Sequence, residues 1–230
     1  MMAQTIRVIP AVAVLIAPCA VGAADRGSSW QEEFGISKCN LLTTGRNPYF
    51  VLEPGFELVL SGKDTKIQIT VLEETKTVDG VATRVVEEKQ WEKGKLHEIA
   101  RNYFAICEQT KDVFYFGEDV DYYENDKVIN HEGSWQAGNG NRPGLMMPGA
   151  PKAKMKFYQE LAPKVAMDRA EIISLEQTCN TPAGTFSRCM KVKESSAIEL
   201  TLSEYKYYAP GIGLVADENV KLIKYGFKKD

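Results

Sequence analysis

The chain has 230 residues, with a hydrophobic content of 44% and a charged content of 26%, a globular composition that excludes an intrinsically disordered chain. Its formal net charge of -3 is too small to point to nucleic acid or to an anionic membrane surface as a partner. A chain of this length can bury a sizeable core as a single domain.

The N-terminus has the three parts of a secretory signal. Residues 1–7 carry one positive charge, residues 8–20 are largely apolar, and small residues follow from Val21 to Ala24. The apolar part is too short to span a bilayer, which takes about 20 residues. We therefore expect a signal peptide over residues 1–24, no transmembrane segment after its cleavage, and a periplasmic or secreted protein. Pro18 precedes Cys19 where a lipid-modified cysteine has a small residue, so we expect no lipid.

Four cysteines remain after cleavage, and in an exported chain four cysteines predict two disulfides. Cys179 and Cys189 flank a predicted hairpin turn at residues 182–184, so we expect them to pair across the hairpin. Cys39 would then pair with Cys107. No two cysteines have the C-x-x-C spacing of a zinc site.

Residues 25–49 show no clear period and are expected to form a lead-in segment. From Phe56 onward apolar and polar residues alternate, as in half-buried antiparallel strands. Asp79-Gly80 is a strong hairpin signal, and further turns follow at about ten-residue spacing. The pattern predicts one β domain over residues 50–230: a mostly β fold with a single curved antiparallel sheet or incomplete barrel. One or two short helices would come from the lead-in segment or from residues 163–170.

Residues 113–151 combine aromatic, acidic, glycine and proline residues more densely than any other segment. They begin as a strand, turn at Asn125-Asp126, and continue into a Gly- and Pro-rich segment that predicts a long loop over the open end of the sheet. Such loops often bind ligands. The predicted ligand contacts are Tyr122, Trp135, Arg142 and Met146, with Trp135 as the apolar anchor and Arg142 facing an anionic head group. The alternative is that Trp135 and Met146 cap the core.

The same region contains the candidates for a metal or hydrolytic site. An acidic run follows the aromatic strand, and its alternation favours a solvated strand face over a calcium loop, which would need a glycine at its turn. His97 and His131 have no metal-ligand spacing, and no G-x-S-x-G motif is present. The members of the acidic run are Glu118, Asp119, Asp121, Glu124 and Asp126.

Several short motifs occur in one order along the chain. They are Asn47-Pro48-Tyr49-Phe50 with Pro54-Gly55, Tyr115-Phe116-Gly117-Glu118-Asp119, Gly133-Ser134-Trp135-Gln136-Ala137-Gly138, Pro143-Gly144 with Met147-Pro148, and the run from Lys206 to Val215. In this combination the chain resembles a family of uncharacterised secreted bacterial proteins, over about residues 47–215. The resemblance implies export and brings no activity with it.

The sequence thus favours a non-enzymatic function. We expect an exported binding protein that holds an apolar or amphipathic small ligand, or a protein partner, against a curved sheet. The alternative is a metal-binding or hydrolytic protein that uses the acidic and histidine groups around residues 113–138. No catalytic residue, metal ligand or cofactor is predicted.

The signal sequence leads to a first prediction. Intact-mass measurement of the protein from its own cells should show a chain that begins at Ala24 or Asp25, without lipid. A diacylglyceryl mass on Cys19 would contradict this prediction.

Overall fold

The computed structural model describes residues 30–228, so the predicted signal peptide lies outside the described residues. Regular structure in this range is almost entirely β-strand, and its one helical segment is the 3-10 helix η1 (Ile36–Lys38) in the lead-in segment. The mostly β fold is confirmed. The helix considered for residues 163–170 is wrong, because this segment makes a turn and then enters a strand. No helix among the described residues is long and apolar enough to cross a membrane.

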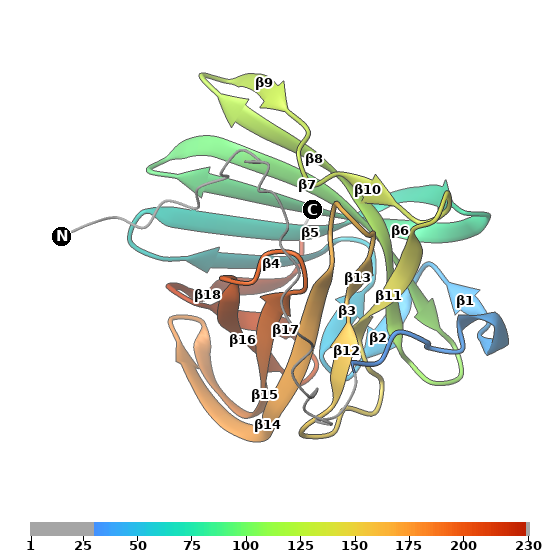
Figure 1. Ribbon diagram of the computed structural model, residues 1–230. Helices are drawn as coiled ribbons and strands as arrows, with labels where there is room; N and C mark the ends of the chain where they lie inside the picture. The colour runs from blue at the N-terminus through green and yellow to red at the C-terminus, as the bar shows by residue number, and fades with distance from the viewer. Residues whose placement is uncertain (1–29, 229–230) are drawn as a thin grey trace, which may run out of the picture.

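Within residues 30–228, sixteen strands form one sheet, and two short strands form a second (Figure 1). The strands are β1 (Leu41–Leu42), β2 (Gly45–Asn47), β3 (Phe50–Leu52), β4 (Phe56–Ser61), β5 (Thr65–Val78), β6 (Val81–Glu92), β7 (Lys95–Cys107), β8 (Val113–Glu124), β9 (Lys127–Asn130), β10 (Trp135–Gln136), β11 (Arg142–Met147), β12 (Lys156–Tyr158), β13 (Glu160–Leu161), β14 (Asp168–Thr181), β15 (Gly184–Ser196), β16 (Ser203–Ala209), β17 (Gly213–Asp217) and β18 (Val220–Phe227).

The large sheet is antiparallel and almost closes on itself. Its strand order is β12-β14-β15-β16-β17-β18-β4-β5-β6-β7-β8-β11-β13, with β1, β9 and β10 paired beside this path. The two ends of the order, β12 and β13, are separated in sequence only by Gln159. The backbone N–H of Gln159 donates to the carbonyl of Asp168 at 2.8 Å. One short chain segment therefore joins both edges, and the sheet becomes barrel-like.

Tight hairpins between the long strands are set by local sequence. Asp79 and Gly80 join β5 to β6 with φ values of 47° and 77°. Lys93 and Gly94 join β6 to β7 with φ values of 50° and 79°. Two successive residues with positive φ are the requirement of a type I′ turn, whose twist matches that of the flanking strands. The hairpin predicted at Asp79-Gly80 is confirmed.

The Gly- and Pro-rich segment after residue 133 differs from the prediction. Much of it forms the strands β10 and β11, which pair with β8, so the expected long loop is wrong. Its glycines allow close backbone contact: a Cβ atom at Gly144 would lie 2.1 Å from the carbonyl oxygen of Gln159. At Gly117 a Cβ would lie 2.3 Å from the carbonyl oxygen of Trp135. The lead-in segment likewise contains strands, β1 and β2.

The cysteines support half of the predicted pairing. Cys39 and Cys107 form a disulfide that ties the lead-in segment to β7, as predicted. Cys179 and Cys189 are buried free thiols, so the second predicted disulfide is not formed. The physical reason lies in the register: Cys179 is opposite Phe186 and Cys189 is opposite Gln177, because the β14–β15 pair shifts register three times.

The thiols give the second prediction. Burial and the neighbouring Cys189 thiol raise the pKa of Cys179 to about 12, so its reactive thiolate is scarce at pH 8. We expect iodoacetamide to leave Cys179 unmodified in the native protein and to alkylate it after unfolding, as shown by peptide mapping without reductant. The same map should contain the Cys39–Cys107 link, which serves as the internal control. A Cys179–Cys189 link would contradict the prediction.

Candidate functional site

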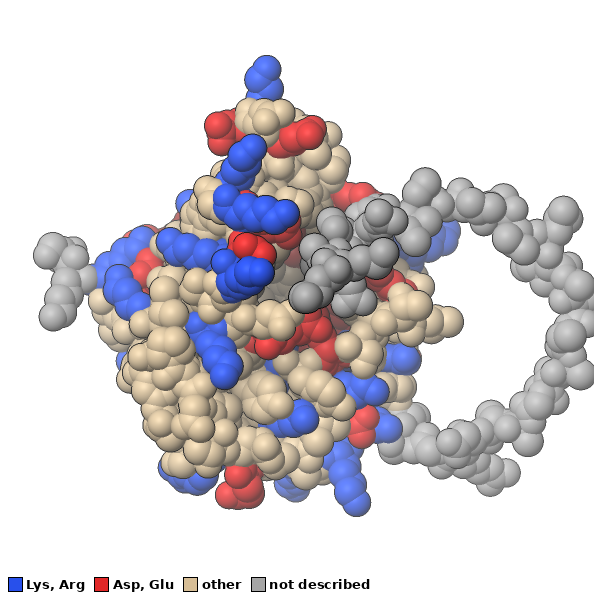
Figure 2. All heavy atoms as spheres, turned by 90° about the vertical axis from the view of Figure 1, so that its left-hand side faces the viewer, with Lys and Arg blue, Asp and Glu red and all other residues tan. Residues whose placement is uncertain are grey.

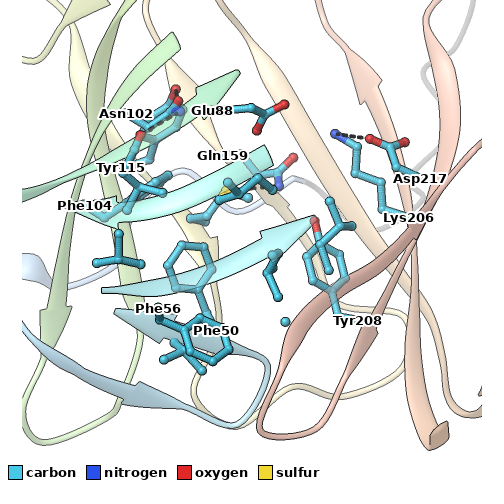
Figure 3. A pocket seen from close by; sticks show the side chains of 18 of the residues that line it. Phe50, Phe56, Glu88, Asn102, Phe104, Tyr115, Gln159, Lys206, Tyr208 and Asp217 are labelled. Carbon is cyan, nitrogen blue, oxygen red and sulfur yellow. Dashed lines mark hydrogen bonds and ion pairs between the residues drawn. The ribbon is translucent and has the colours of Figure 1, made fainter. Parts of the chain in front are cut away.

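The interior of the barrel-like sheet contains a cavity of about 220 Å³ (Figure 3). Strands from every part of the sheet line it, together with β3 and the segment that joins the two edges. The chemistry of the lining is mixed. Its apolar residues include Phe50, Phe56, Leu58, Ile69, Phe104 and Met146, and its polar residues are Glu88, Asn102, Tyr115, Gln159, Glu160, Asp168, Glu194, Lys206, Tyr208 and Asp217.

Strand alternation places these side chains. Successive residues of a strand point to opposite faces, so residues two apart share the interior. Val86 and Glu88 of β6 both line the cavity, as do Asn102 and Phe104 of β7, and Lys206 and Tyr208 of β16. Each of these pairs combines one residue of the polar part with one residue nearer the apolar part. The polar and apolar groups therefore separate along the strand direction.

This separation is visible in the close-up view. Glu88, Asn102, Lys206 and Asp217 lie at one end of the cavity, and Phe50 and Phe56 lie at the other (Figure 3). A ligand that fills the cavity would thus contact aromatic and aliphatic groups at one end and ionisable groups at the other. This is the usual character of a small-molecule site, which is mostly apolar with a few placed polar groups.

Lys206 is the one basic side chain among the residues that line the cavity. Its Nζ lies 2.7 Å from Glu194 Oε2, 3.2 Å from Glu204 Oε1 and 3.8 Å from Asp217 Oδ2. Burial opposes its charge, but the surrounding carboxylates outweigh burial and hold the pKa of Lys206 well above its usual value. Lys206 is therefore a permanently charged group that is already fully engaged by protein carboxylates.

Hydrogen bonds hold most of the other polar groups. Gln159 Nε2 and the Tyr208 hydroxyl both donate to Glu194 Oε1, at 3.1 and 3.3 Å. Trp135 Nε1 donates to Glu160 Oε1 at 3.2 Å. The Tyr115 hydroxyl donates to Asn102 Oδ1.

Glu88 is the exception. Its carboxyl group points into the cavity and makes no hydrogen bond or ion pair with any residue in the range 30–228 (Figure 3). Burial raises the pKa of Glu88 to about 7. Lys206 acts in the opposite direction, and three further carboxyl groups add to the increase: Glu98, Asp217 and Glu194. Glu88 is thus half-buried and faces the cavity, and burial outweighs the favourable effect of Lys206 on its charge.

The other interior acids share this environment. Burial is the largest cause of a raised pKa for Glu118, to about 8, and for Asp217, to about 6. Burial and the neighbouring Glu118 and Asp168 also raise the pKa of Glu160 well above its usual value. A raised pKa means that the interior favours either protons or another positive charge near these carboxyl groups. The site has a surplus of acidic groups over basic ones.

Acidic side chains also lie close together on the outer surface. In Figure 2 acidic side chains gather near the centre of one face of the molecule, and lysine and arginine side chains lie around them.

The predicted ligand contacts are only partly brought together. Met146 lines the cavity, whereas Tyr122, Trp135 and Arg142 do not. Trp135 is 4% exposed and packs edge-on against Tyr115 with ring centroids 5.5 Å apart, so it supports the cavity wall from behind. Arg142 is exposed and paired with Glu32 and Glu33. Tyr122 is half-buried and hydrogen-bonded to Glu98.

The alternative site around residues 113–138 is dispersed. His131 Nδ1 lies 2.8 Å from Asp121 Oδ1 at the surface, and His97 packs against Tyr122. Glu118 lies among the interior acids, so a solvated face is wrong for that residue. Within residues 30–228, no three His, Cys, Asp or Glu side chains are placed to hold a metal ion.

Sequence reasoning missed Glu88, Lys206 and Asp217. Glu88 follows another glutamate, Glu87, and nothing local tells which of the two faces inward. Lys206 had a usable signal: it alternates with Tyr208 in an aromatic strand, a spacing that places both on one face.

No protein-family model matches the chain, and no curated protein matches it. Among solved structures the chain is similar to a candidate lipoprotein from Parabacteroides distasonis, with 16% sequence identity and a TM-score of 0.38. The alignment covers 80% of this chain and 100% of that chain. The Cys39–Cys107 disulfide is itself compatible with an exported protein, since disulfides persist in oxidising compartments.

The third prediction concerns Glu88 and pH. The folded state holds a proton on Glu88 up to about pH 7, whereas a glutamate with its usual pKa of 4.5 loses it earlier, so this group lowers stability as pH rises from 5 to 8. Glutamine does not ionise, so Glu88→Gln should remove the contribution of Glu88 to this loss of stability. We expect the variant to be more stable than wild type at pH 8, by about 1–3 kcal/mol, and nearly equal at pH 5, in urea unfolding.

Glu87→Gln is the matched control for this measurement. Glu87 faces the other side of β6 and pairs with Lys89 at 2.7 Å. Its substitution should give no gain at pH 8. An equal effect of Glu88→Gln at both pH values would show that Glu88 does not titrate in this range.

Proposed function

We propose that this protein is an exported binding protein, periplasmic or secreted, that holds a small ligand with an apolar part in the interior of its sheet. The observation that carries the proposal is the interior cavity with an aromatic and aliphatic end and a polar end. The export part rests on the N-terminal signal pattern, on the disulfide, and on the resemblance to a family of secreted bacterial proteins.

The apolar end supplies the binding free energy in this proposal. Phe50, Phe56 and Phe104 offer large apolar surfaces, and transfer of apolar ligand surface from water contributes roughly 25 cal/mol per Å² before the costs of binding. The cavity volume of about 220 Å³ lies below the ~300–1,000 Å³ usual for ligand pockets. The ligand, or the part of it that enters, is therefore small.

A binding role agrees better with this interior than the metal-dependent or hydrolytic alternative. Among the described residues, Gln159, Lys206, Trp135 and Tyr208 hold three of the acids that line the cavity, Glu160, Glu194 and Asp217. Asp168 is hydrogen-bonded to Ser196, and Glu88 has no such partner. The two histidines lie outside the lining. The interior thus presents a partly open cavity with fixed polar groups, which is what selective binding requires.

The fourth prediction uses three probes with the same six-carbon chain: 1-hexanol, hexylamine and hexanoate. At least one should bind saturably to the purified protein, measured by chemical-shift changes in two-dimensional NMR spectra. Val86→Phe adds a ring to the cavity wall and should weaken that binding by about tenfold or more, because it fills space that the chain would occupy.

Val128→Phe is the matched control, since Val128 is 43% exposed on β9 and outside the cavity lining. It should leave binding unchanged. The proposal is overturned if none of the three probes binds, or if Val86→Phe folds cooperatively and binds them as wild type does.

A further inference from the structure

We infer that the ligand of this cavity carries a positively charged head group, of the protonated amine class, which lies against Glu88 while its apolar part lies between Phe50 and Phe56. This inference rests on the proposed function and names the chemistry of its ligand. Three observations carry it: a half-buried acid that faces the cavity without a hydrogen-bond or ion-pair partner among the described residues, a single basic group that is already engaged, and the separation of the two ends.

The first observation is the free carboxyl group of Glu88. It faces the cavity at the polar end and accepts no hydrogen bond from any residue between 30 and 228 (Figure 3). A carboxyl group that faces a cavity without a protein partner is free to accept hydrogen bonds from a ligand. A protonated amine in the cavity supplies three N–H donors and the opposite charge.

The second observation is that no basic side chain of the cavity lining forms an ion pair with Glu88. Lys206 is the one basic residue in the lining, and its ammonium group already lies within 4 Å of Glu194, Glu204 and Asp217. Five carboxyl groups line the same cavity: Glu88, Glu160, Asp168, Glu194 and Asp217. The acidic surplus is therefore built into the wall, and a cationic ligand would balance it.

The same arrangement disfavours an anionic head group. An anion at the polar end would have to compete with three carboxylates for Lys206, and it would lie near the remaining acids. A neutral head group could hydrogen-bond to Glu88 but would leave the charge surplus unchanged. The head groups thus rank as ammonium, then hydroxyl, then carboxylate.

The size and polarity of the cavity define the rest of the ligand. A cavity of about 220 Å³ favours a small ligand, such as a primary amine with a short chain or a single ring. The opposite end is aromatic, so the chain or ring lies among Phe50 and Phe56 while the amine reaches Glu88. A bare metal ion would leave the apolar end empty.

The test compares hexylamine, 1-hexanol and hexanoate at pH 8, where Glu88, with its pKa raised to about 7, is mostly ionised and hexylamine is still protonated. Dissociation constants are measured by NMR titration of wild type, Glu88→Gln and Glu87→Gln. Wild type should bind hexylamine about tenfold or more tightly than 1-hexanol, and hexanoate most weakly. Glu88→Gln should lose the preference for hexylamine over 1-hexanol. Glu87→Gln, altered on the opposite face of β6, should keep that preference.

The outcomes separate this inference from the proposed function. If wild type binds hexylamine and 1-hexanol equally, and Val86→Phe weakens both, the cavity binds ligands but the inference is overturned. Tighter binding of hexanoate, or a preference for hexylamine that survives in Glu88→Gln, also overturns it. If no probe binds, the proposed function fails as well. The comparison within wild type needs no variant, so it decides the question even if Glu88→Gln does not fold.

Discussion

The structure depends on the closure of one antiparallel sheet by a single short chain segment. β12 pairs with one edge and β13 with the other, and Gln159 joins them. Closure gives the sheet a single interior, and strand alternation then sends half of each strand's side chains into it. The same Gln159 lines the cavity and donates to Glu194. Gln159 therefore both joins the two edges of the sheet and belongs to the polar part of the cavity lining.

The interior combines two opposing contributions to stability. Large fully buried side chains such as Leu52, Leu60 and Phe114 favour the folded state by removing apolar surface from water. Buried carboxyl groups oppose it, because each charged form loses its hydration. The ion pairs of Lys206 compensate only some of these acids. An interior with uncompensated polar groups is what binding sites commonly retain at the expense of stability.

Features that depend on adjacent residues could be predicted from the sequence, whereas features that depend on contacts between distant strands could not. The hairpin at Asp79-Gly80 and the alternating strands are encoded by adjacent residues, so the fold class could be read from the sequence. The β14–β15 bulges, which place Cys179 and Cys189 out of register with each other, have no local signal. The inward position of Glu88 depends on how distant strands close the sheet. The Gly- and Pro-rich segment was predicted to be a loop, but Gly144 permits close contact between strands there.

The hydrogen bond from Trp135 to Glu160 gives the molecule an optical property. Indole emission depends on the polarity and charge around the ring, and Trp135 donates its N–H to an acid whose pKa is strongly raised. Trp30 and Trp91 are both more exposed than Trp135. A change of charge in the interior therefore alters the spectrum of one buried chromophore, which makes the protein its own spectroscopic reporter of what the cavity contains.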